Sequence, residues 1–371
     1  MPSVWTSRTF NTAAHSLAPL KALGVRLLVS HTRPDSPVFT VADEGFLEPQ
    51  LTGAAWAEWA LSVCRERRPD VLWVTREAEA AAEVRAEFEA LGTRLLCPSV
   101  EALRATRSKC DVYEAAESLG IATPPWLRVT GPEQAAEVPL GWCVKPDEGQ
   151  GAEDVYQLVD GWEGLPVFQQ LPRRLFLEHV ARNPRTTWIA LPWLPGLEHS
   201  VDVLMPQQVA AVRTKADGSR LQRATHDDDL VEASVTMLGG LGIAPLGNVQ
   251  WRELAGERVL LEVNPRPSGG LYRSSQALGV DLLAAALGLV EVDGARIESV
   301  VSTTSLDVAV GLPAQHLQQV LPTEGAGALG DVRALVPQQV QLAVSGPDGV
   351  GGGLEEVAVE EAVAGGEQLT A

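Results

Sequence analysis

The chain of 371 residues has few cysteines, and their placement suits neither disulfides nor zinc. Cys64, Cys97, Cys110 and Cys143 stand singly, with no Cys-x-x-Cys pair and no histidine beside them at metal-ligand spacing. Disulfide-rich domains and zinc modules both carry recurring cysteine spacings. We therefore expect reduced thiols, most of them buried.

Long apolar runs and basic residues are scarce as well. No apolar stretch approaches the roughly 20 residues that span a bilayer, and the start MPSVWTSRTF lacks the basic and then apolar order of a secretory signal. The 29 Lys and Arg residues against 48 Asp and Glu residues give a net charge of −19, which repels phosphate backbones and anionic lipid. We expect a cytoplasmic protein that binds neither nucleic acid nor a membrane.

Residues 1 to about 105 alternate between strand-like and helical patterns, but a dinucleotide fingerprint is missing. The expected elements are strands at 3–6, 25–30, 71–74 and 94–97, with helices at 13–23, 52–67 and 78–91 between them. This alternation builds a parallel sheet covered by helices on both faces. The first turn reads TSRTFNTAAH, without G-x-G-x-x-G, so this doubly wound domain is not a plain dehydrogenase module.

The sequence pattern changes from Ser108 onward. A helix in SKCDVYEAAESLG and the breaker IATPPW come first, and short strand-like runs then continue to Val263. Residues 281–290 predict a buried helix, and Val-rich strands separated by glycines follow. The part from Ser345 contains GVGGG and several acidic residues but no basic ones, which favours a flexible, solvated tail over a binding arm.

The run RVLLEVN contains the strongest candidate for a metal site. It has the pattern of a strand in which Leu261 and Val263 face one side while Glu262 and Asn264 face the other. Carboxylate and amide oxygens are ligands that a hard cation such as Mg²⁺ prefers. Taken alone, the run is equally compatible with an exposed strand that ends in a proline turn.

The residues after this strand suit an anion. Pro265 ends the strand, and Arg266 supplies a planar donor fork for a phosphate or a carboxylate. Ser268, Gly269 and Gly270 offer a backbone that an anion can approach closely. We expect the metal and an anionic group to lie side by side at this point.

The preceding strand offers a third metal ligand. In GNVQWREL, Gln250 and Arg252 share one face, and a turn at residues 255–257 makes this strand the antiparallel neighbour of the next. Counting back from the turn places Gln250 roughly opposite Glu262. Gln250 is therefore a candidate ligand of the same ion, and a satisfied surface amide is the alternative.

Two further charged stretches have competing interpretations. Arg213 and Lys215 lie on an apparent strand and point the same way, which suits either a triphosphate or ordinary exposed strand charges. The run from His226 to Asp229 could be a second metal site, but consecutive residues point in different directions. A solvated loop or a helix start is the favoured interpretation of this run.

In their order, these motifs resemble the ATP-grasp superfamily, in particular its carbamoyl-phosphate-synthetase-like carboxylate-amine ligases. Members place a Gln, Asp or Glu on one strand and Glu-x-Asn-Pro-Arg on the next, as at Gln250, Glu262, Asn264 and Arg266 here. The resemblance covers residues 1–290. It implies an α/β fold with a doubly wound parallel-sheet domain at 1–105 and an ATP-grasp domain at 106–290 (lid-bearing part 106–187, metal-binding part 188–290). Outside the resemblance, the sequence pattern alone predicts a β-rich extension at 291–344 and the acidic tail at 345–371.

The resemblance also implies which residues bind ATP. The two family lysines look like Lys109, which opens a helix, and Lys145, which ends the apolar strand GWCVK before a flexible loop. The phosphate loop looks like Gly149, Gln150 and Gly151. The adenine hinge looks like Trp193 and Leu194, and the acid that binds ribose looks like Glu198. The sequence departs from the family at Asp147, Glu148 and Glu153, which make the loop more acidic, and at Pro192, where an acid is common. A buried core tryptophan is the alternative for Trp193.

The implied reaction is an ATP-dependent ligation that uses Mg²⁺, or alternatively Mn²⁺. A carboxylate attacks the γ-phosphate to give an acylphosphate and ADP, and an amine or similar nucleophile then displaces phosphate. Arg266 and Arg213 are expected to stabilise the reacting charge, and Arg8, Asn11, Ser268 and Gly269 are candidate contacts to the small-molecule carboxylate and amine. The alternatives are a catalytically silent ATP-binding regulator and a small-molecule kinase, and a homodimer is compatible with the sequence.

Overall fold

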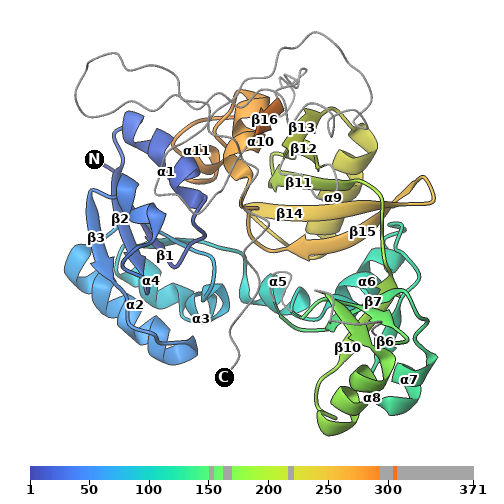
Figure 1. The fold of residues 1–371 in the computed structure, drawn as a ribbon. Coiled ribbons are helices and arrows are strands. Elements are labelled where there is room, and N and C mark those ends of the chain that lie inside the picture. The colour runs from blue at the N-terminus through green and yellow to red at the C-terminus, as the bar shows by residue number, and fades with distance from the viewer. Residues whose placement is uncertain (150–153, 162–168, 216–220, 293–303, 307–371) are drawn as a thin grey trace, which may run out of the picture. The chain divides into compact units, whose positions relative to one another are not determined.

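The computed structural model describes residues 1–149, 154–161, 169–215, 221–292 and 304–306 (Figure 1). The chain divides into the units Met1–Leu321 and Pro322–Ala371, and every described residue belongs to the first unit. The strands expected beyond residue 306 and the tail expected from Ser345 lie outside the described residues. Within the described ranges, no helix is both long enough and apolar enough to cross a membrane.

The N-terminal residues form the doubly wound sheet that the sequence predicts. Its five strands are all parallel and lie in the order β3-β2-β1-β4-β5. They are β1 (Ser3–Ser7), β2 (Arg26–His31), β3 (Glu44–Leu47), β4 (Val71–Val74) and β5 (Arg94–Leu96). The direction of winding reverses between β1 and β4, and ligands of open α/β sheets bind beyond the carboxyl ends of the strands at such a point.

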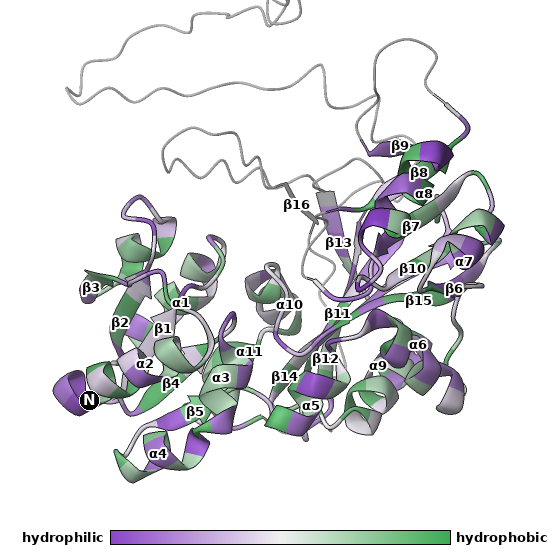
Figure 2. Ribbon diagram, turned by 90° about the horizontal axis from the view of Figure 1, so that it is seen from below, coloured by the Kyte–Doolittle hydropathy of each residue, from purple (hydrophilic) through white to green (hydrophobic). Residues whose placement is uncertain are grey.

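Helices cover both faces of this sheet, and two of them come from the far end of the described chain (Figures 1 and 2). One face packs against three helices through a core that includes Trp5, Trp56 and Phe88. The other face packs through a core that includes Leu17, Leu271 and Leu283. The helices on the first face are α2 (Gly53–Arg67), α3 (Ala78–Glu83) and α4 (Arg85–Ala90), and those on the second are α1 (Ala13–Ala22), α10 (Leu271–Leu278) and α11 (Leu282–Ala286).

Some elements of this part depart from the expectation. The helix expected at residues 78–91 is divided at Val84, and the Arg85 guanidinium just after the break donates hydrogen bonds to the carbonyl oxygens of Leu95, Cys97 and Pro98. These bonds tie α4 to the end of β5. The 3₁₀ helix η1 (Pro37–Val41) and the edge strand β3 were not expected, because both are short and β3 is only partly buried.

Two further sheets follow, again with helices packed on them. The second sheet has the order β6-β10-β7-β8-β9 and buries Val144, Phe176 and Trp188 under its helices. Its elements are β6 (Leu127–Val129), α7 (Pro132–Glu137), β7 (Trp142–Pro146), β8 (Tyr156–Val159), β9 (Gln170–Pro172), α8 (Arg173–Arg182) and β10 (Trp188–Pro192).

The third sheet is antiparallel, with the order β15-β14-β11-β12-β13-β16. Its core includes Val112, Met237 and Trp251 and lies under α6 and α9. The elements are α5 (Val100–Ala105), α6 (Lys109–Ser118), β11 (Glu198–Leu204), β12 (Val209–Lys215), β13 (Leu221–Thr225), α9 (Asp228–Gly240), β14 (Leu246–Leu254), β15 (Glu257–Asn264) and β16 (Thr304–Leu306). Helices α10 and α11 lie between α1 and this sheet (Figures 1 and 2).

Several local predictions can be compared directly with this fold. The helix expected at residues 281–290 is present as the shorter α11, whereas α10 was not expected. Asp227 accepts a hydrogen bond from the backbone N–H of Leu230 (3.1 Å) as the cap of α9, which confirms a helix start in place of a second metal site. Arg258 pairs with Asp227 and Asp229, so these carboxylates have partners.

The four cysteines are buried and free, as expected. Burial raises the pKa of the Cys64 and Cys97 thiols to about 11 and that of Cys110 to about 12, and it also raises the pKa of Cys143. Thiols with such pKa values are protonated near neutral pH and react slowly, because the thiolate is the nucleophile. These cysteines act as small packing residues.

Candidate active site

The end of β15 and the facing part of β14 bring together the three expected metal ligands. Gln250 pairs with Glu262, and Asn248 pairs with Asn264, in the antiparallel register of the two strands. Directly opposed residues project from the same face of a sheet. Ala255 and Gly256, which join the strands, have φ of 52° and 87°, as a two-residue hairpin turn requires. The predicted pairing of Gln250 with Glu262 is confirmed.

One prediction for this strand is wrong, and a β-bulge is the reason. Trp251 pairs with Leu260, so Leu261 is an extra residue between two regular pairs. Leu260 and Val263 pack into the core of the third sheet, whereas Leu261 packs in a different cluster beside Tyr113. Leu261 and Val263 therefore do not share a face, although Glu262 still lies opposite Gln250.

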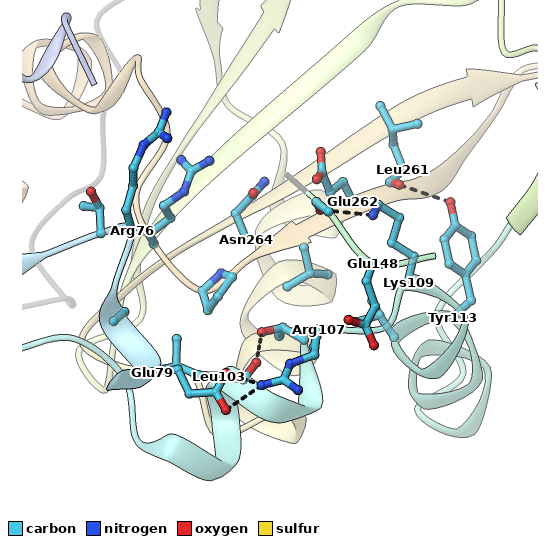
Figure 3. A pocket seen from close by; sticks show the side chains of 18 residues that line it. Arg76, Glu79, Leu103, Arg107, Lys109, Tyr113, Glu148, Leu261, Glu262 and Asn264 are labelled. Atoms are coloured by element: carbon cyan, nitrogen blue, oxygen red, sulfur yellow. Dashed lines mark hydrogen bonds and ion pairs between the residues drawn. The ribbon is translucent and has the colours of Figure 1, made fainter. Parts of the chain in front are cut away.

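A buried tyrosine holds this bulge in place. The Tyr113 hydroxyl lies 3.1 Å from the carbonyl oxygens of both Leu260 and Leu261 and donates to this pair. Figure 3 shows the bond to Leu261. Tyr113 is 1% exposed and follows Lys109 by one helical turn on α6. The helix that carries one expected ATP lysine is thus bonded to the strand that carries the expected metal ligands.

We expect Tyr113→Phe to lower the free energy of unfolding by about 1–2 kcal/mol, because two buried carbonyl groups lose this donor. The variant should also need more Mg²⁺ for nucleotide binding, since the bulge precedes Glu262 directly. Urea unfolding and calorimetric titration of ADP at several Mg²⁺ concentrations measure the two effects. Tyr156→Phe removes a hydroxyl that bonds the exposed Asp154 and is the matched control. Equal behaviour of the two variants would contradict the role of Tyr113.

Lys109 lies between the start of α6 and the end of β7. Its ammonium group donates to the carbonyl oxygens of Pro146 (3.1 Å), Asp147 (2.9 Å) and Gly149 (3.1 Å). Burial lowers the pKa of Lys109, the positive charge of Lys145 lowers it further, and the negative charge of Glu262 opposes both. The two expected ATP lysines and the expected metal carboxylate are therefore close enough to influence one another.

The acidic residues of the expected phosphate loop have separate positions. Asp147 is buried, and its carboxylate accepts a hydrogen bond from the backbone N–H of Cys110 (2.8 Å) near the start of α6. Glu148 instead lines a cavity beside Lys109 (Figure 3). Gly149 has a φ of 133°, a conformation that strongly favours glycine. Gln150, Gly151 and Glu153 lie outside the described residues.

Two cavities meet at the end of β15. Glu262, Asn264 and Arg266 line both of them. The first cavity, of about 290 Å³, is otherwise lined by Thr75, Arg76, Ala78, Glu79, Leu103, Thr106, Arg107, Lys109, Val112, Tyr113, Glu148, Gly149, Leu261, Val263 and Pro265 (Figure 3). The second, of about 370 Å³, is otherwise lined by Thr12, Ser200, Arg213, Lys215, Gln222, Asn248, Gln250, Ser268, Gly269, Gly270, Tyr272 and Arg273.

The expected adenine and ribose contacts lie at the link between the second and third sheets. Trp193 follows β10 and is 37% exposed, so it is not a core tryptophan. Leu194 is buried, and its carbonyl oxygen accepts a hydrogen bond from Arg252 (2.5 Å). Glu198 accepts a hydrogen bond from Lys215 (2.5 Å), so these two expected nucleotide contacts are paired with each other. Trp193, Leu194 and Glu198 do not line either cavity.

Arg213 is the centre of a buried polar cluster beneath the second cavity. It is 2% exposed and forms an ion pair with Asp202 (2.8 Å), whose side chain is fully buried. Its guanidinium also donates to the hydroxyl groups of Ser200 (3.1 Å), Ser268 (2.6 Å) and Ser274 (2.8 Å). Burial alone would raise the pKa of Asp202, but the Arg213 charge and several hydrogen bonds outweigh it and hold that pKa below its usual value.

This cluster gives the residues that follow β15 a role different from the one that the sequence suggested. The Ser268 hydroxyl and backbone N–H both donate hydrogen bonds to Asp202, so both donors of this serine are used within the protein. A Cβ atom at Gly270 would collide with the Arg213 guanidinium, and one at Gly269 would lie 3.1 Å from the Thr12 hydroxyl. Gly270 thus makes room for an arginine, where the sequence suggested room for an anion.

The structure does not bring Arg8 or Asn11 to either cavity. Arg8 is buried, pairs with Glu48 and Glu77, and donates to the carbonyl oxygen of Pro49 (2.6 Å). Asn11 is exposed in the following turn. The first turn of the sheet therefore stabilises its own domain through Arg8, and only its neighbour Thr12 reaches the second cavity.

Sequence reasoning missed Arg76, which lines the first cavity from the loop after β4. The signal was present, because β1 and β4 are neighbours at the point where the winding of the sheet reverses. The same rule selected Arg8 after β1 and could have selected Arg76 after β4. Asn248, Tyr272 and Arg273 in the second cavity were also missed, and no pattern in the sequence distinguishes them.

Comparisons with known proteins agree with this arrangement. Residues 184–311 match the family described as ATP-grasp in the biosynthetic pathway with Ter operon. The chain is 23% identical over 296 residues to the carbamoyl phosphate synthase large chain of Clostridium beijerinckii, a match that covers 73% of this chain and 26% of that protein. The chain thus spans about a quarter of the length of this curated relative.

Solved structures share the fold at low sequence identity. L-amino acid ligase from Bacillus licheniformis has a TM-score of 0.60 at 15% identity, covering 84% of this chain and 80% of that chain. N5-carboxyaminoimidazole ribonucleotide synthetase from Thermotoga maritima has a TM-score of 0.60 at 16% identity, covering 83% and 81%. Biotin carboxylase from Campylobacter jejuni has a TM-score of 0.62 at 14% identity, covering 82% and 75%. The predicted fold class is confirmed for the described residues.

Proposed function

The chain is an ATP-grasp protein, and from that premise we propose that it is an ADP-forming ligase, joining a carboxylate to an amine or similar nucleophile through an acylphosphate. The observation that supports this proposal is the shared wall of the two cavities. Glu262, Asn264 and Arg266 face both, so a nucleotide and a small acid could approach the same five-residue segment. Bringing two reactants to one point supplies much of the catalysis in such reactions.

The expected metal ligands fit Mg²⁺ or Mn²⁺ by their chemistry. Gln250, Glu262 and Asn264 offer one carboxylate and two amide groups from neighbouring positions on two strands. Carboxylate and amide oxygens are the ligands that such a hard cation prefers. A hard cation held there by Gln250, Glu262 and Asn264 would neutralise the charge of nucleotide phosphates.

The basic residues have distinct roles in the proposal. Lys109 and Lys145 neutralise nucleotide phosphates from the side of the second sheet, and Arg266 binds the small-molecule substrate at the shared wall. Arg213 holds the Ser268–Gly270 segment from beneath, because its donors are occupied by Asp202 and three serines. Trp193 and Leu194 bind adenine, and Glu198 binds ribose after release from Lys215. The ATP-grasp part runs from residue 106 to residue 290, with the hinge near residue 188.

A turnover screen tests the proposed function. We expect ADP release from Mg·ATP to require both a carboxylate and an amine, supplied as pools of amino acids, other small acids and polyamines. Mass spectrometry of the products should show a condensation product and inorganic phosphate. A phosphorylated small molecule as the stable product would instead identify a kinase, and nucleotide binding without acceptor-dependent ADP release would identify a regulator.

A further inference from the structure

Two arginines at one end of the first cavity have no carboxylate partner. Arg76 lies in the loop after β4, and Arg266 lies just after β15, so the two come from different sheets. Among the described residues, no Asp or Glu forms an ion pair with either of them, and the only hydrogen bond of the Arg266 guanidinium is a long one to the Pro267 carbonyl oxygen (3.4 Å). The Arg266 guanidinium also lies 6.0 Å from the centre of the Phe10 ring.

The nearby acidic side chains are used elsewhere. Glu77 pairs with Arg8 and accepts a hydrogen bond from the Gly53 backbone, while Glu79 pairs with Arg104 and Arg107. Arg107 lines the same cavity as Arg76. Of these two arginines, Arg107 is paired with a carboxylate and, within the described part of the chain, Arg76 is not.

The two acids that remain in the cavity are not placed to neutralise Arg76. Figure 3 shows Glu148 beside Lys109, on the opposite side of the cavity from Arg76. Glu262 lies between them, and the proposed metal would engage its charge. Arg76 and Arg266 meanwhile repel each other, since each carries a fixed positive charge. Two unpaired guanidinium groups in a partly buried cavity are the arrangement that an anion stabilises.

We propose that one of the two small-molecule substrates carries an anionic group besides the carboxylate that is activated, and that Arg76 and Arg266 bind this group together. This inference rests on the proposed ligase function. The activated carboxylate must meet the nucleotide near Glu262 and Asn264, whereas Arg76 lies toward the N-terminal sheet. The bound group therefore lies on the side of the activated carboxylate that faces Arg76 and the N-terminal sheet, and a carboxylate or a phosphate would match the two donor forks.

Direct anion binding tests this site without any turnover. The probes are succinate, inorganic phosphate and the neutral analogue succinamide, each titrated calorimetrically into the intact chain without nucleotide. We expect succinate or phosphate to bind and succinamide not to bind. Arg76→Gln should weaken anion binding by about 10- to 100-fold, the value of a lost charge-assisted contact. Whichever anion binds more tightly indicates whether the group is a carboxylate or a phosphate.

Matched variants keep the test decisive. Arg104→Gln removes the same charge from a nearby, 55% exposed side chain outside the cavity, and it should bind the anions as the parent does. Arg76→Lys keeps the charge but loses the planar fork and should bind with intermediate affinity. Unfolding curves of all variants show whether the fold is intact. Equal anion affinity in the parent and Arg76→Gln would overturn the proposal, as would a parent that binds neither anion.

The result is separable from the ligase assignment. If the turnover screen finds a substrate pair, Arg76→Gln should raise the KM for the anionic substrate and leave the KM for ATP unchanged. If no pair gives ADP while Arg76→Gln still abolishes anion binding, the anion site stands and the ligase function fails. An active ligase whose KM values are all unchanged in Arg76→Gln would refute the anion site alone.

Discussion

Glu262→Gln is expected to reduce magnesium-dependent turnover by about 1,000-fold or more, with the fold intact. The substitution keeps the shape of the side chain but removes the one negative charge among the three proposed metal ligands. Removing a single electrostatic contact to a transition state commonly costs about 100- to 1,000-fold, and loss of a metal ligand adds weaker metal binding to this. Asn264→Ala should have a similar effect.

The control and a second measurement separate metal binding from general damage. Glu257→Gln makes the same change at the exposed start of β15, outside both cavities, and should retain full activity. ADP release across a range of Mg²⁺ concentrations gives the activity, and Mn²⁺ binding followed by electron paramagnetic resonance reports the site directly. Parent-like turnover and Mn²⁺ affinity in both Glu262→Gln and Asn264→Ala would refute the metal assignment.

Asp202→Ala is expected to lower the free energy of unfolding by about 3–5 kcal/mol, the usual cost of leaving one member of a buried ion pair alone. Arg213 would keep its charge in a site that is 2% exposed, and Ser268 and Ser274 would lose their shared acceptor. Guanidinium chloride unfolding measures the loss. The double variant Asp202→Ala/Arg213→Met should recover part of it, because it removes the unpaired charge together with its partner. A double variant less stable than Asp202→Ala would contradict this explanation.

The same pair predicts a pH dependence. The pKa of Asp202 is held below its usual value in the folded protein, so its stabilising contribution is present above the unfolded pKa of about 3.9. As the pH falls below about 4, the unfolded chain takes up the proton first, and the contribution is lost. The stability difference between the parent and Asp202→Ala should therefore shrink in this range, as unfolding curves recorded at several pH values would show.

Features that depend on neighbouring residues were predictable from the sequence. The hairpin of β14 and β15 follows from two strand patterns and a short turn, and the turn fixes Gln250 opposite Glu262. The alternating elements of the N-terminal part likewise gave the parallel sheet. In both cases the hydrophobic period identifies the element, and the connection determines its partner.

Features that depend on distant partners were not predictable. The bulge at Leu261 is bonded by a hydroxyl 148 positions earlier in the chain, and its presence changes which side chains share a face. Gly270 is required by Arg213, which is near it only in the folded protein. Arg8 and Arg76 follow equivalent strands, and only the positions of Glu48 and Glu77 determine that Arg8 is neutralised. No single sequence contains these pairings as a local pattern.

The wall common to the two cavities also constrains how such a site can be redesigned. A substitution at Glu262, Asn264 or Arg266 alters both chambers at once, so it cannot adjust the preference for one reactant without disturbing the other. The outer walls are independent of each other: Arg76 belongs to the first chamber only, and Tyr272 belongs to the second only. Mutant libraries that aim to change the substrate preference of this fold should therefore randomise the loop after β4 and the start of α10 separately. The shared wall of Glu262, Asn264 and Arg266 should be kept constant.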